Sequence, residues 1–256
     1  MTQKLLTRRN FLHVGTTAAI AGIGYAGYRA MSAPGFLGVL ESAEYATLNA
    51  QRALLVGQPL AREFSPSDMS PVFKANGTTH PGGVACQEML AANFSNWRLR
   101  VDGLVANPMT LSLADLKRMP QRTQITRHDC VEGWSAIGKW TGVPLGHILE
   151  QAGLAAHARY VVFHCADDVY GDSGRYYESV DLFDAFHPQT ILAHAMNDAA
   201  LPVAHGAPLR LRVERQLGYK HAKYVMRIEV VDSFRSIGQG RGGFWEDRGY
   251  EWYAGI

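Results

Sequence analysis

The sequence predicts an α+β domain in which strands outnumber helices. The stretches "WRLRVDGLV", "APLRLRVER" and "AKYVMRIEVVD" alternate apolar and polar residues, as half-buried strands do. The stretch "VPLGHILEQAGL" instead spaces its apolar residues as one face of a helix. The chain has 256 residues, of which 47% are hydrophobic and 19% charged, so it can bury a substantial core. Its net charge of +2 is too small to indicate a nucleic-acid partner.

The composition divides the chain into four segments. Residues 1–33 read as an N-terminal signal or anchor, and residues 34–94 as an irregular arm in which "ESAEYATLNAQRALL" is expected to form one helix. Residues 95–232 contain the periodic stretches and form the predicted domain. Residues 233–256 form an aromatic tail without periodicity, which we expect to pack back on the domain.

Several elements follow in order along the domain. In "TLSLADLKRM", Ser112 and Asp115 have the spacing of a capping box at the start of a short helix. "QRTQITRHDCV" is extended, which places Cys130 at the end of a strand, and Gly153 is a suitable end for the helix over 143–153. The remaining expectations are strands in "RYVVFHCA" and "QTILAHAM", one or two helical turns in "SVDLFDAFHP", and a strand pair formed by "APLRLRVER" and "AKYVMRIEVVD" around the loop "QLGYKH".

The N-terminus resembles a twin-arginine export signal. Arg8 and Arg9 precede Phe11 and a weakly apolar run rich in Gly and Ala. Glycines, threonines and His13 make this run a poor permanent membrane helix, so we favour the signal, which would direct the protein to the periplasm. Whether it is cleaved near Ala33 or stays attached as a tether is left open. Because this route carries folded proteins, a cofactor inserted before export is expected.

The three cysteines limit the kinds of metal site. Cys86, Cys130 and Cys165 form an odd set, so at least one thiol remains unpaired in an oxidising compartment. The sequence contains no CxxC and no CxxCH, so it offers no c-type haem site and no zinc knuckle.

The stretch "CVEGWSAIGKWTGVPLGHIL" resembles the core motif of the sulfite oxidase family of molybdopterin-dependent oxidoreductases. The likeness extends to "HGAPLRLRVERQLGYKHAKYVMRIEV" and "GFWEDRGYEWY", and these segments cover most of residues 96–253. It implies the β-rich, sulfite oxidase-like domain, with mixed sheets and a few short helices. It also implies a molybdenum-molybdopterin cofactor whose metal is ligated by the Cys130 thiolate, and no haem within this chain.

The resemblance also implies particular site residues. Glu132 stands two residues after Cys130, on the same side of an extended segment, and is expected to act near the metal or to handle protons. An exposed charge for Arg210 and a plain core position for Cys165 remain alternatives. The residues implied to bind the cofactor are Asn76, Thr79, His80, Cys165, His205, Arg210 and Lys223, together with the backbone N–H groups of His221 and Ala222.

The resemblance implies an exported enzyme that transfers an oxygen atom to or from a small sulfoxide- or sulfite-type substrate. The short bacterial periplasmic members, some of which reduce methionine sulfoxide, are the most similar branch. "KANGTTHP" has Lys74 where sulfite oxidases use an arginine, which disfavours sulfite. Expected partners are the twin-arginine export machinery and an external electron donor or acceptor, for which a membrane haem protein is a candidate.

Two other interpretations remain open at this point. The chain could be a secreted binding domain that keeps the fold without catalysis and is stapled by a Cys86–Cys165 disulfide. It could also be a zinc hydrolase that uses His128, Asp129 and His164, although their spacing fits no HExxH helix.

Overall fold

The computed structural model describes residues 46–53, 57, 59–169 and 174–256. The chain divides into two compact units, Met1–Gln58 and Pro59–Ile256. In the first unit, residues 46–53 are helical, which agrees with the helix expected there. Residues 1–33, in which a signal is expected, lie outside the described residues. Among the residues that are described, no helix is both long and apolar enough to cross a membrane.

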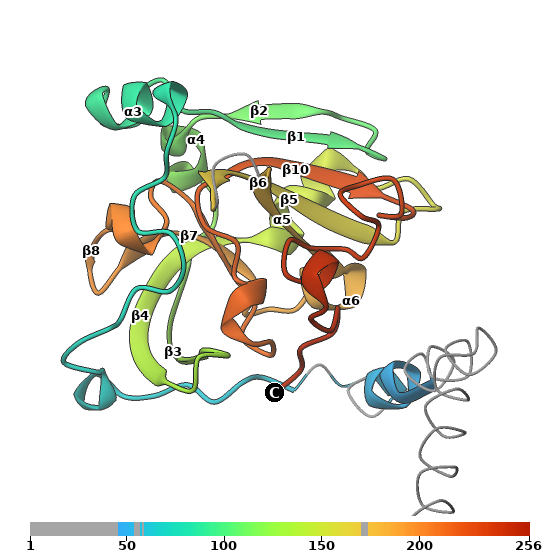
Figure 1. The fold of residues 1–256 in the computed structure, drawn as a ribbon, viewed down its shortest axis with the longest axis horizontal. Coiled ribbons are helices and arrows are strands. Elements are labelled where there is room, and N and C mark those ends of the chain that lie inside the picture. The colour runs from blue at the N-terminus through green and yellow to red at the C-terminus, as the bar shows by residue number, and fades with distance from the viewer. Residues whose placement is uncertain (1–45, 54–56, 58, 170–173) are drawn as a thin grey trace, which may run out of the picture. The chain divides into compact units, whose positions relative to one another are not determined.

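The second unit contains two five-stranded sheets (Figure 1). The first has the strand order β2-β1-β10-β5-β6, and its pairings are antiparallel except for the parallel pair β1 and β10. The second has the order β3-β4-β7-β8, with β9 also paired to β7. The strands are β1 (Leu99–Gly103), β2 (Met109–Leu111), β3 (Arg122–Asp129), β4 (Ser135–Pro144), β5 (Tyr160–Asp168), β6 (Arg175–Asp181), β7 (Ile191–Met196), β8 (Ala199–Ala200), β9 (Arg210–Arg212) and β10 (Val225–Val231).

The helices of this unit are short. The predicted capping box is confirmed at the start of α4, where the Asp115 N–H donates to Ser112 Oγ (3.1 Å) and the Ser112 N–H to Asp115 Oδ2 (2.8 Å). The predicted helix end is confirmed as well, because Gly153 follows α5 with φ of 67°. The helical segments are η1 (Pro66–Asp68), α3 (Val84–Ala91), α4 (Leu113–Arg118), α5 (Leu145–Ala152), α6 (Leu182–Ala185), η2 (Val203–His205), η3 (Gly218–Lys220) and η4 (Glu246–Arg248).

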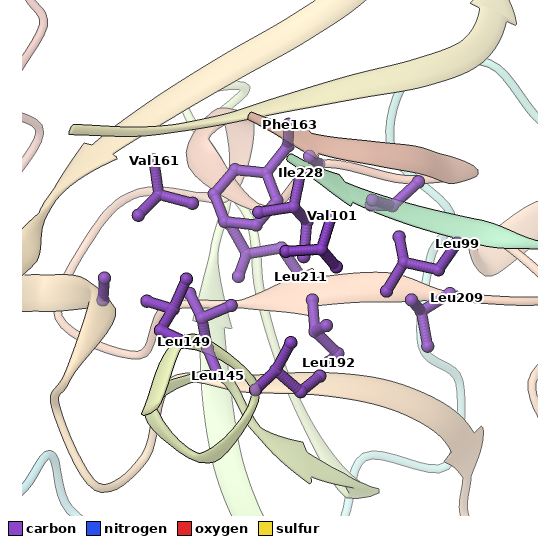
Figure 2. Close-up of a cluster of buried hydrophobic side chains, with 14 of the residues drawn as sticks. Leu99, Val101, Leu145, Leu149, Val161, Phe163, Leu192, Leu209, Leu211 and Ile228 are labelled. Atoms are coloured by element: carbon purple, nitrogen blue, oxygen red, sulfur yellow. The ribbon is translucent and has the colours of Figure 1, made fainter. Parts of the chain in front are cut away.

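The main hydrophobic core combines side chains from both sheets and from α5 (Figure 2). Leu99 of β1 and Phe163 of β5 represent the first sheet, Leu192 of β7 and Leu211 of β9 the second, and Leu149 the helix; all five are fully buried. Burying each such side chain contributes on the order of 2 kcal/mol. The shared core holds β9 against the first sheet, and this matters because β9 carries residues of the site. The mixed sheets and short helices confirm the predicted α+β class.

The arm between residues 59 and 80 follows the second sheet before it reaches the site. Glu63 forms a bridge with Thr126, and the Phe64 N–H donates to the Ile125 carbonyl of β3 (2.9 Å). The Ser70 N–H then donates to the Ile137 carbonyl of β4 (3.0 Å). These bonds extend the edge of the sheet and carry the following residues toward the end of β3.

The expected strand pair around "QLGYKH" is wrong. β9 pairs with β7 in the second sheet, whereas β10 lies between β1 and β5 in the first. The twelve residues from Val213 to Tyr224 therefore cross between sheets and include η3. The sequence interpretation also missed β2, β4, β6, β8 and α3, which are very short or lie in stretches with several glycines or without clear alternation.

The C-terminal residues return to the first half of this crossover. The Leu217 N–H donates to the Ala254 carbonyl (2.8 Å), and the Ile256 N–H to the Arg215 carbonyl (3.0 Å). The Trp252 ring stacks on Phe234, with 5.7 Å between ring centroids. The tail thus supports the segment that leads from β9 to β10.

Candidate cofactor site around Cys130

Cys130 begins the tight turn between β3 and β4, as the extended pattern before it predicted. Its N–H donates to the Trp134 carbonyl (2.9 Å), and the Gly133 N–H donates back to the Cys130 carbonyl (3.0 Å). Gly133 has φ of 84°, a conformation that glycine adopts without strain. The turn fixes the Cys130 backbone, and the thiol is free and only 8% exposed. Burial raises the pKa of this thiol, while Lys74 and Arg210 oppose the rise.

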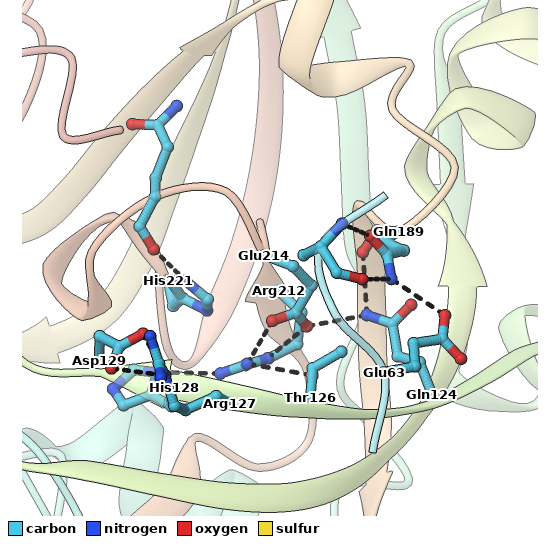
Figure 3. Close-up of polar contacts among 12 residues, drawn as sticks. Glu63, Gln124, Thr126, Arg127, His128, Asp129, Gln189, Arg212, Glu214 and His221 are labelled. Carbon is cyan, nitrogen blue, oxygen red and sulfur yellow. Dashed lines mark hydrogen bonds and ion pairs between the residues drawn. The ribbon is translucent and has the colours of Figure 1, made fainter. Parts of the chain in front are cut away.

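Arg212 organises the buried polar groups behind this turn (Figure 3). Its Nε and Nη2 donate to the two carboxylate oxygens of Glu214, at 2.9 and 2.6 Å. Its Nη1 donates to Nδ1 of His128 (2.9 Å), so His128 carries its proton on Nε2. Gln124 donates to the same Glu214 carboxylate (2.8 Å). The guanidinium also lies over the Trp140 ring, 4.5 Å from its centroid.

His128 and His221 present ring nitrogens with no hydrogen-bond partner in the described part of the chain. Burial holds the pKa of both imidazoles well below the usual value, so both are neutral. His221 Nε2 donates to the Gln216 carbonyl (3.0 Å), which leaves Nδ1 as an acceptor. The free His128 Nε2–H is a donor. The rings lie edge to face with centroids 5.0 Å apart, and together they offer one donor and one acceptor.

Arg210 is fully buried, and within the described chain its hydrogen bonds go to neutral oxygens. It donates to the His205 carbonyl (3.1 Å) and, at 3.5 Å, to the side-chain oxygen of Asn76. Its Nε lacks a partner among the described residues. Burial, together with Arg212, lowers the pKa of Arg210 to about 9, which still leaves it charged at neutral pH. The exposed-charge alternative for Arg210 is therefore wrong, and the site holds a buried cation without a carboxylate contact.

Lys223 adds a second buried cation and joins the arm to this wall. Its Nζ donates to the carbonyls of Asn76 (2.7 Å), Ala204 (3.0 Å) and Thr78. Burial, with Arg210 nearby, lowers the pKa of Lys223 to about 7. The three bonds fix the backbone of the arm beside Arg210.

Phe73 of the arm connects these groups in space. Its ring centroid lies 5.7 Å from that of His128, 6.4 Å from Trp134, 5.4 Å from Trp140 and 5.6 Å from His205. Burial lowers the pKa of His205 to about 4, and its Nδ1 has no partner within the described chain. The Cys130 turn, the buried arginines and His205 therefore surround one region.

Glu132 lies on the exposed side of the same turn. Trp134 Nε1 donates to its carboxylate (3.0 Å), and Lys74 forms an ion pair with it (3.4 Å). The Trp134 hydrogen bond and then Lys74 lower the pKa of Glu132, so the carboxylate is ionised at neutral pH.

The remaining predicted residues are more distant or already engaged. Thr79 and His80 are exposed and contact each other (3.2 Å). Cys165 lies in the main hydrophobic core. The N–H groups of His221 and Ala222 donate within their own turn, to Gly218 (3.2 Å) and Lys220 (3.1 Å), so a phosphate there would have to replace these bonds.

The structure contradicts specific features of both alternative interpretations. Cys86, Cys130 and Cys165 are all free, so the Cys86–Cys165 disulfide is not formed. His164 pairs with Glu229 on the first sheet (2.8 Å), away from His128. No group of three or more potential ligands for a metal ion occurs among the described His, Cys, Asp and Glu residues, which contradicts the zinc site.

Sequence reasoning named His128 only as a ligand in the zinc-hydrolase interpretation, and it missed Arg212 and Glu214 as site residues. Their signal was the period of two residues along a strand: His128 precedes Cys130 by two, and Arg212 and Glu214 follow Arg210 by two and four.

The donor set fits an anionic, hydrogen-bonding cofactor. Arg210 and Lys223 supply buried positive charge, and Arg210 Nε, His205 Nδ1, His128 Nε2 and His221 Nδ1 are buried polar atoms that lack a partner in the described chain. Leaving such groups unsatisfied costs about 1–3 kcal/mol each. Cys130 adds a thiol, the ligand type that soft redox metals favour.

Comparison with known proteins agrees with this chemistry. Residues 87–236 match the oxidoreductase molybdopterin binding domain. A putative protein-methionine-sulfoxide reductase subunit, YedZ1 of Azospira oryzae, is 41% identical over 199 residues, which cover 75% of this chain and 70% of that protein. The sulfane dehydrogenase SoxCD of Paracoccus pantotrophus has a similar fold, with a TM-score of 0.50 at 21% identity; the similarity covers 69% of this chain and 46% of that chain.

The domain match spans more than half of the chain, and the relative of Azospira oryzae covers most of it at substantial identity. The chain therefore belongs to the oxidoreductase molybdopterin binding domain family, in its sulfite oxidase-like branch, and is a molybdenum-dependent oxidoreductase.

Proposed function

We propose that this chain is an exported enzyme that transfers an oxygen atom to or from a small substrate, with Cys130 as the protein ligand to molybdenum. A sulfoxide is the favoured substrate class. One observation carries the proposal: a rigidly held, buried thiol beside the buried Arg210, whose contacts are with neutral oxygens. The name of the relative in Azospira oryzae supports a sulfoxide.

Each group of the site has a role in this proposal. Arg210 and Lys223 would bind the phosphate of molybdopterin, because buried cations recognise such an anion strongly. His205, His128 and His221 would offer ring nitrogens to the polar edge of the pterin. When bound, the cofactor supplies a two-electron redox centre able to exchange one oxygen atom. Cys130 would hold the metal through its thiolate.

Glu132 would handle protons on the open side of the turn. Reduction of a sulfoxide to a thioether consumes two electrons and two protons and releases water. The ionised Glu132 carboxylate lies two residues from Cys130, and Lys74 and Trp134 hold it in place. It can accept a proton from solvent and deliver it toward the departing oxygen. The electrons would come from an external donor, for which a membrane haem protein is a candidate.

Cys130→Ser provides the direct test of metal ligation. A serine hydroxyl is a harder and weaker metal ligand than a thiolate. The activity of the variant should therefore fall by roughly 100-fold, and the variant should lose its molybdenum. Metal analysis and the optical spectrum of protein from a molybdenum-competent host measure this. The matched control is Cys86→Ser, since Cys86 is also a buried free thiol and contacts the Ala166 carbonyl. Folded wild type without metal, or equal metal in Cys130→Ser, would contradict the proposal.

Arg210→Met separates cofactor binding from stability. Removing the cation should lower the retained molybdopterin by roughly 10- to 100-fold. The cofactor-free protein should gain about 1–3 kcal/mol in free energy of unfolding, because a buried charge without a carboxylate contact is removed. Pterin fluorescence of the released cofactor and urea unfolding give the two values. Arg118→Met, an exposed arginine on α4, should change neither. A loss of stability in Arg210→Met would show that Arg210 is structural.

The substrate class is tested with artificial redox dyes. Methionine sulfoxide, dimethyl sulfoxide and nitrate are offered to the reduced enzyme, and sulfite to the oxidised enzyme. We expect turnover of the two sulfoxides and little oxidation of sulfite, because "KANGTTHP" supplies Lys74 and no arginine beside Cys130. Sulfite oxidation as the fastest reaction would reverse this preference.

Export to the periplasm is proposed from Arg8 and Arg9. The double variant Arg8→Lys/Arg9→Lys should leave the folded protein in the cytoplasm, since the export machinery reads the paired guanidinium groups. Cell fractionation followed by immunoblotting measures this, and the mass of the exported wild type shows whether the signal is cleaved. Unchanged periplasmic protein in the double variant would contradict the twin-arginine route.

A further inference from the structure

A buried ionic cluster lies next to the loop that leads to His221 and Lys223. Lys220, the last residue of η3, forms ion pairs with Glu178 of β6 (2.6 Å) and with Glu246 of η4. Two of these side chains have 0% exposure and the third 1%. We name Glu178, Lys220 and Glu246 the carboxylate–lysine cluster. Nothing in the proposed chemistry at Cys130 uses it.

The charges of the cluster do not balance if both carboxylates are ionised. Two carboxylates and one ammonium would leave a net negative charge in a fully buried place, which is costly. Each carboxylate also has one oxygen without a hydrogen-bond donor in the described chain, Glu178 Oε1 and Glu246 Oε2. Both oxygens face Gly243: a Cβ built there would lie 2.0 Å from Glu246 Oε2 and 2.8 Å from Glu178 Oε1. They are two acceptors directed at one place, and a single proton would satisfy both.

Among the described residues, no positive charge besides Lys220 contributes to the pKa shift of Glu178. Burial raises the pKa of Glu178 well above the usual value, more than the attraction of Lys220 lowers it. Burial alone would lower the pKa of Lys220, but the two carboxylates leave it raised, so the ammonium stays charged. Other titratable groups that face the pair have pKa values raised first by burial and are neutral; they are Tyr176, Tyr177, Tyr219 and Cys165.

The same loop is anchored at its other residues. The Tyr176 hydroxyl of β6 donates to the Tyr219 carbonyl (2.5 Å), and the Tyr219 hydroxyl donates to the Glu251 carbonyl of the tail (2.8 Å). Gly218 packs so closely on His128 that a Cβ would lie 2.5 Å from His128 Nε2. A shift of η3 would therefore move His128, and the chain continues directly into His221, Ala222 and Lys223.

We propose that Glu178 and Glu246 share one proton, and that the neutral cluster they form with Lys220 positions the loop 218–223 for cofactor binding. Lys220 is a positioning residue that acts through its neighbours. The positioning part rests on the proposed function, in which this loop faces the cofactor. The shared proton does not depend on it.

Glu178→Gln tests the proton. Glutamine keeps the shape and leaves Lys220 paired with Glu246, so the variant should fold and keep its cofactor. The pKa of Glu178 in the folded protein lies above its ordinary value of 4.5. The protonated Glu178 therefore contributes its full stability below pH 4.5, and this contribution is lost as the pH rises through the folded-state pKa. The free energy of unfolding of the wild type should fall as the pH rises from 4.5 through the folded-state pKa, and that of Glu178→Gln should fall less. The wild type should show the infrared carbonyl band of a buried carboxylic acid, and this band should be absent from Glu178→Gln. Equal pH slopes, or no such band in the wild type, would overturn the shared proton.

Lys220→Met tests the positioning in the full chain. Without the ammonium, the buried pair keeps an uncompensated charge, so Tm should fall by about 10 °C. Hydrogen exchange in the peptide covering 218–223 should quicken by roughly tenfold or more. Lys220→Arg should restore slow exchange, and Lys117→Met, an exposed lysine on α4, should change neither value.

The readouts separate the two proposals. Exchange and infrared spectra need no cofactor, so they decide this inference even if the wild type contains no molybdenum, a result that would defeat the proposed function alone. In molybdenum-loaded protein, Lys220→Met should lose the metal on dialysis faster than Lys117→Met. Unchanged exchange and unchanged metal retention in Lys220→Met would overturn the positioning role. If Lys220→Met does not fold, Lys220→Arg and Glu178→Gln still give these measurements.

Discussion

The burial of two arginines on the three-residue strand β9 is the constraint on which the site depends. Arg210 and Arg212 are both fully buried, and the Trp140 ring lies 5.1 and 4.5 Å from their guanidinium carbons. Glu214 neutralises Arg212 through two hydrogen bonds, whereas Arg210 contacts neutral oxygens. Desolvating a guanidinium without a counter-charge costs several kcal/mol. Arg210 lies where the Cys130 turn, the arm and the loop 218–223 meet. An anionic cofactor bound there would offset the free energy lost by burying its charge.

Local patterns were enough for most single elements and failed for their pairing. Alternation indicated β1, β9 and β10, other extended or buried stretches indicated β3, β5 and β7, and Ser112 with Asp115 indicated the start of α4. The sequence did not predict β4, because Gly138 and Gly142 interrupt its pattern of apolar and polar residues. The place of β4 between β3 and β7 depends on contacts between residues distant in sequence. The expected pair of β9 with β10 failed for the same reason. Two alternating stretches near each other suggest a hairpin, but the crossover with η3 sends them to different sheets.

For the site as well, the sequence indicated single residues but not all the contacts between them. Cys130, Asn76, His205, Arg210 and Lys223 were named from the sequence, and the structure brings them around one region. The bonds from His128 through Arg212 to Glu214 were not found. No pattern in a single sequence tells a buried arginine from an exposed one on a strand, because the difference lies in Trp140 above it and in the acid beside it.

The parallel pairing of β1 with β10 has a consequence for how the protein is made. β1 begins at Leu99, and its partner β10 ends at Val231, so the central strand of the first sheet is among the last parts of the domain to leave the ribosome. The stretch that holds Arg210 and Lys223 is made just before it. Pairing between such distant strands is slow and cannot begin during most of synthesis. Under the proposed export of the folded chain, Arg8 and Arg9 would be made long before the domain is complete, so completion of the C-terminal half would set the interval before export.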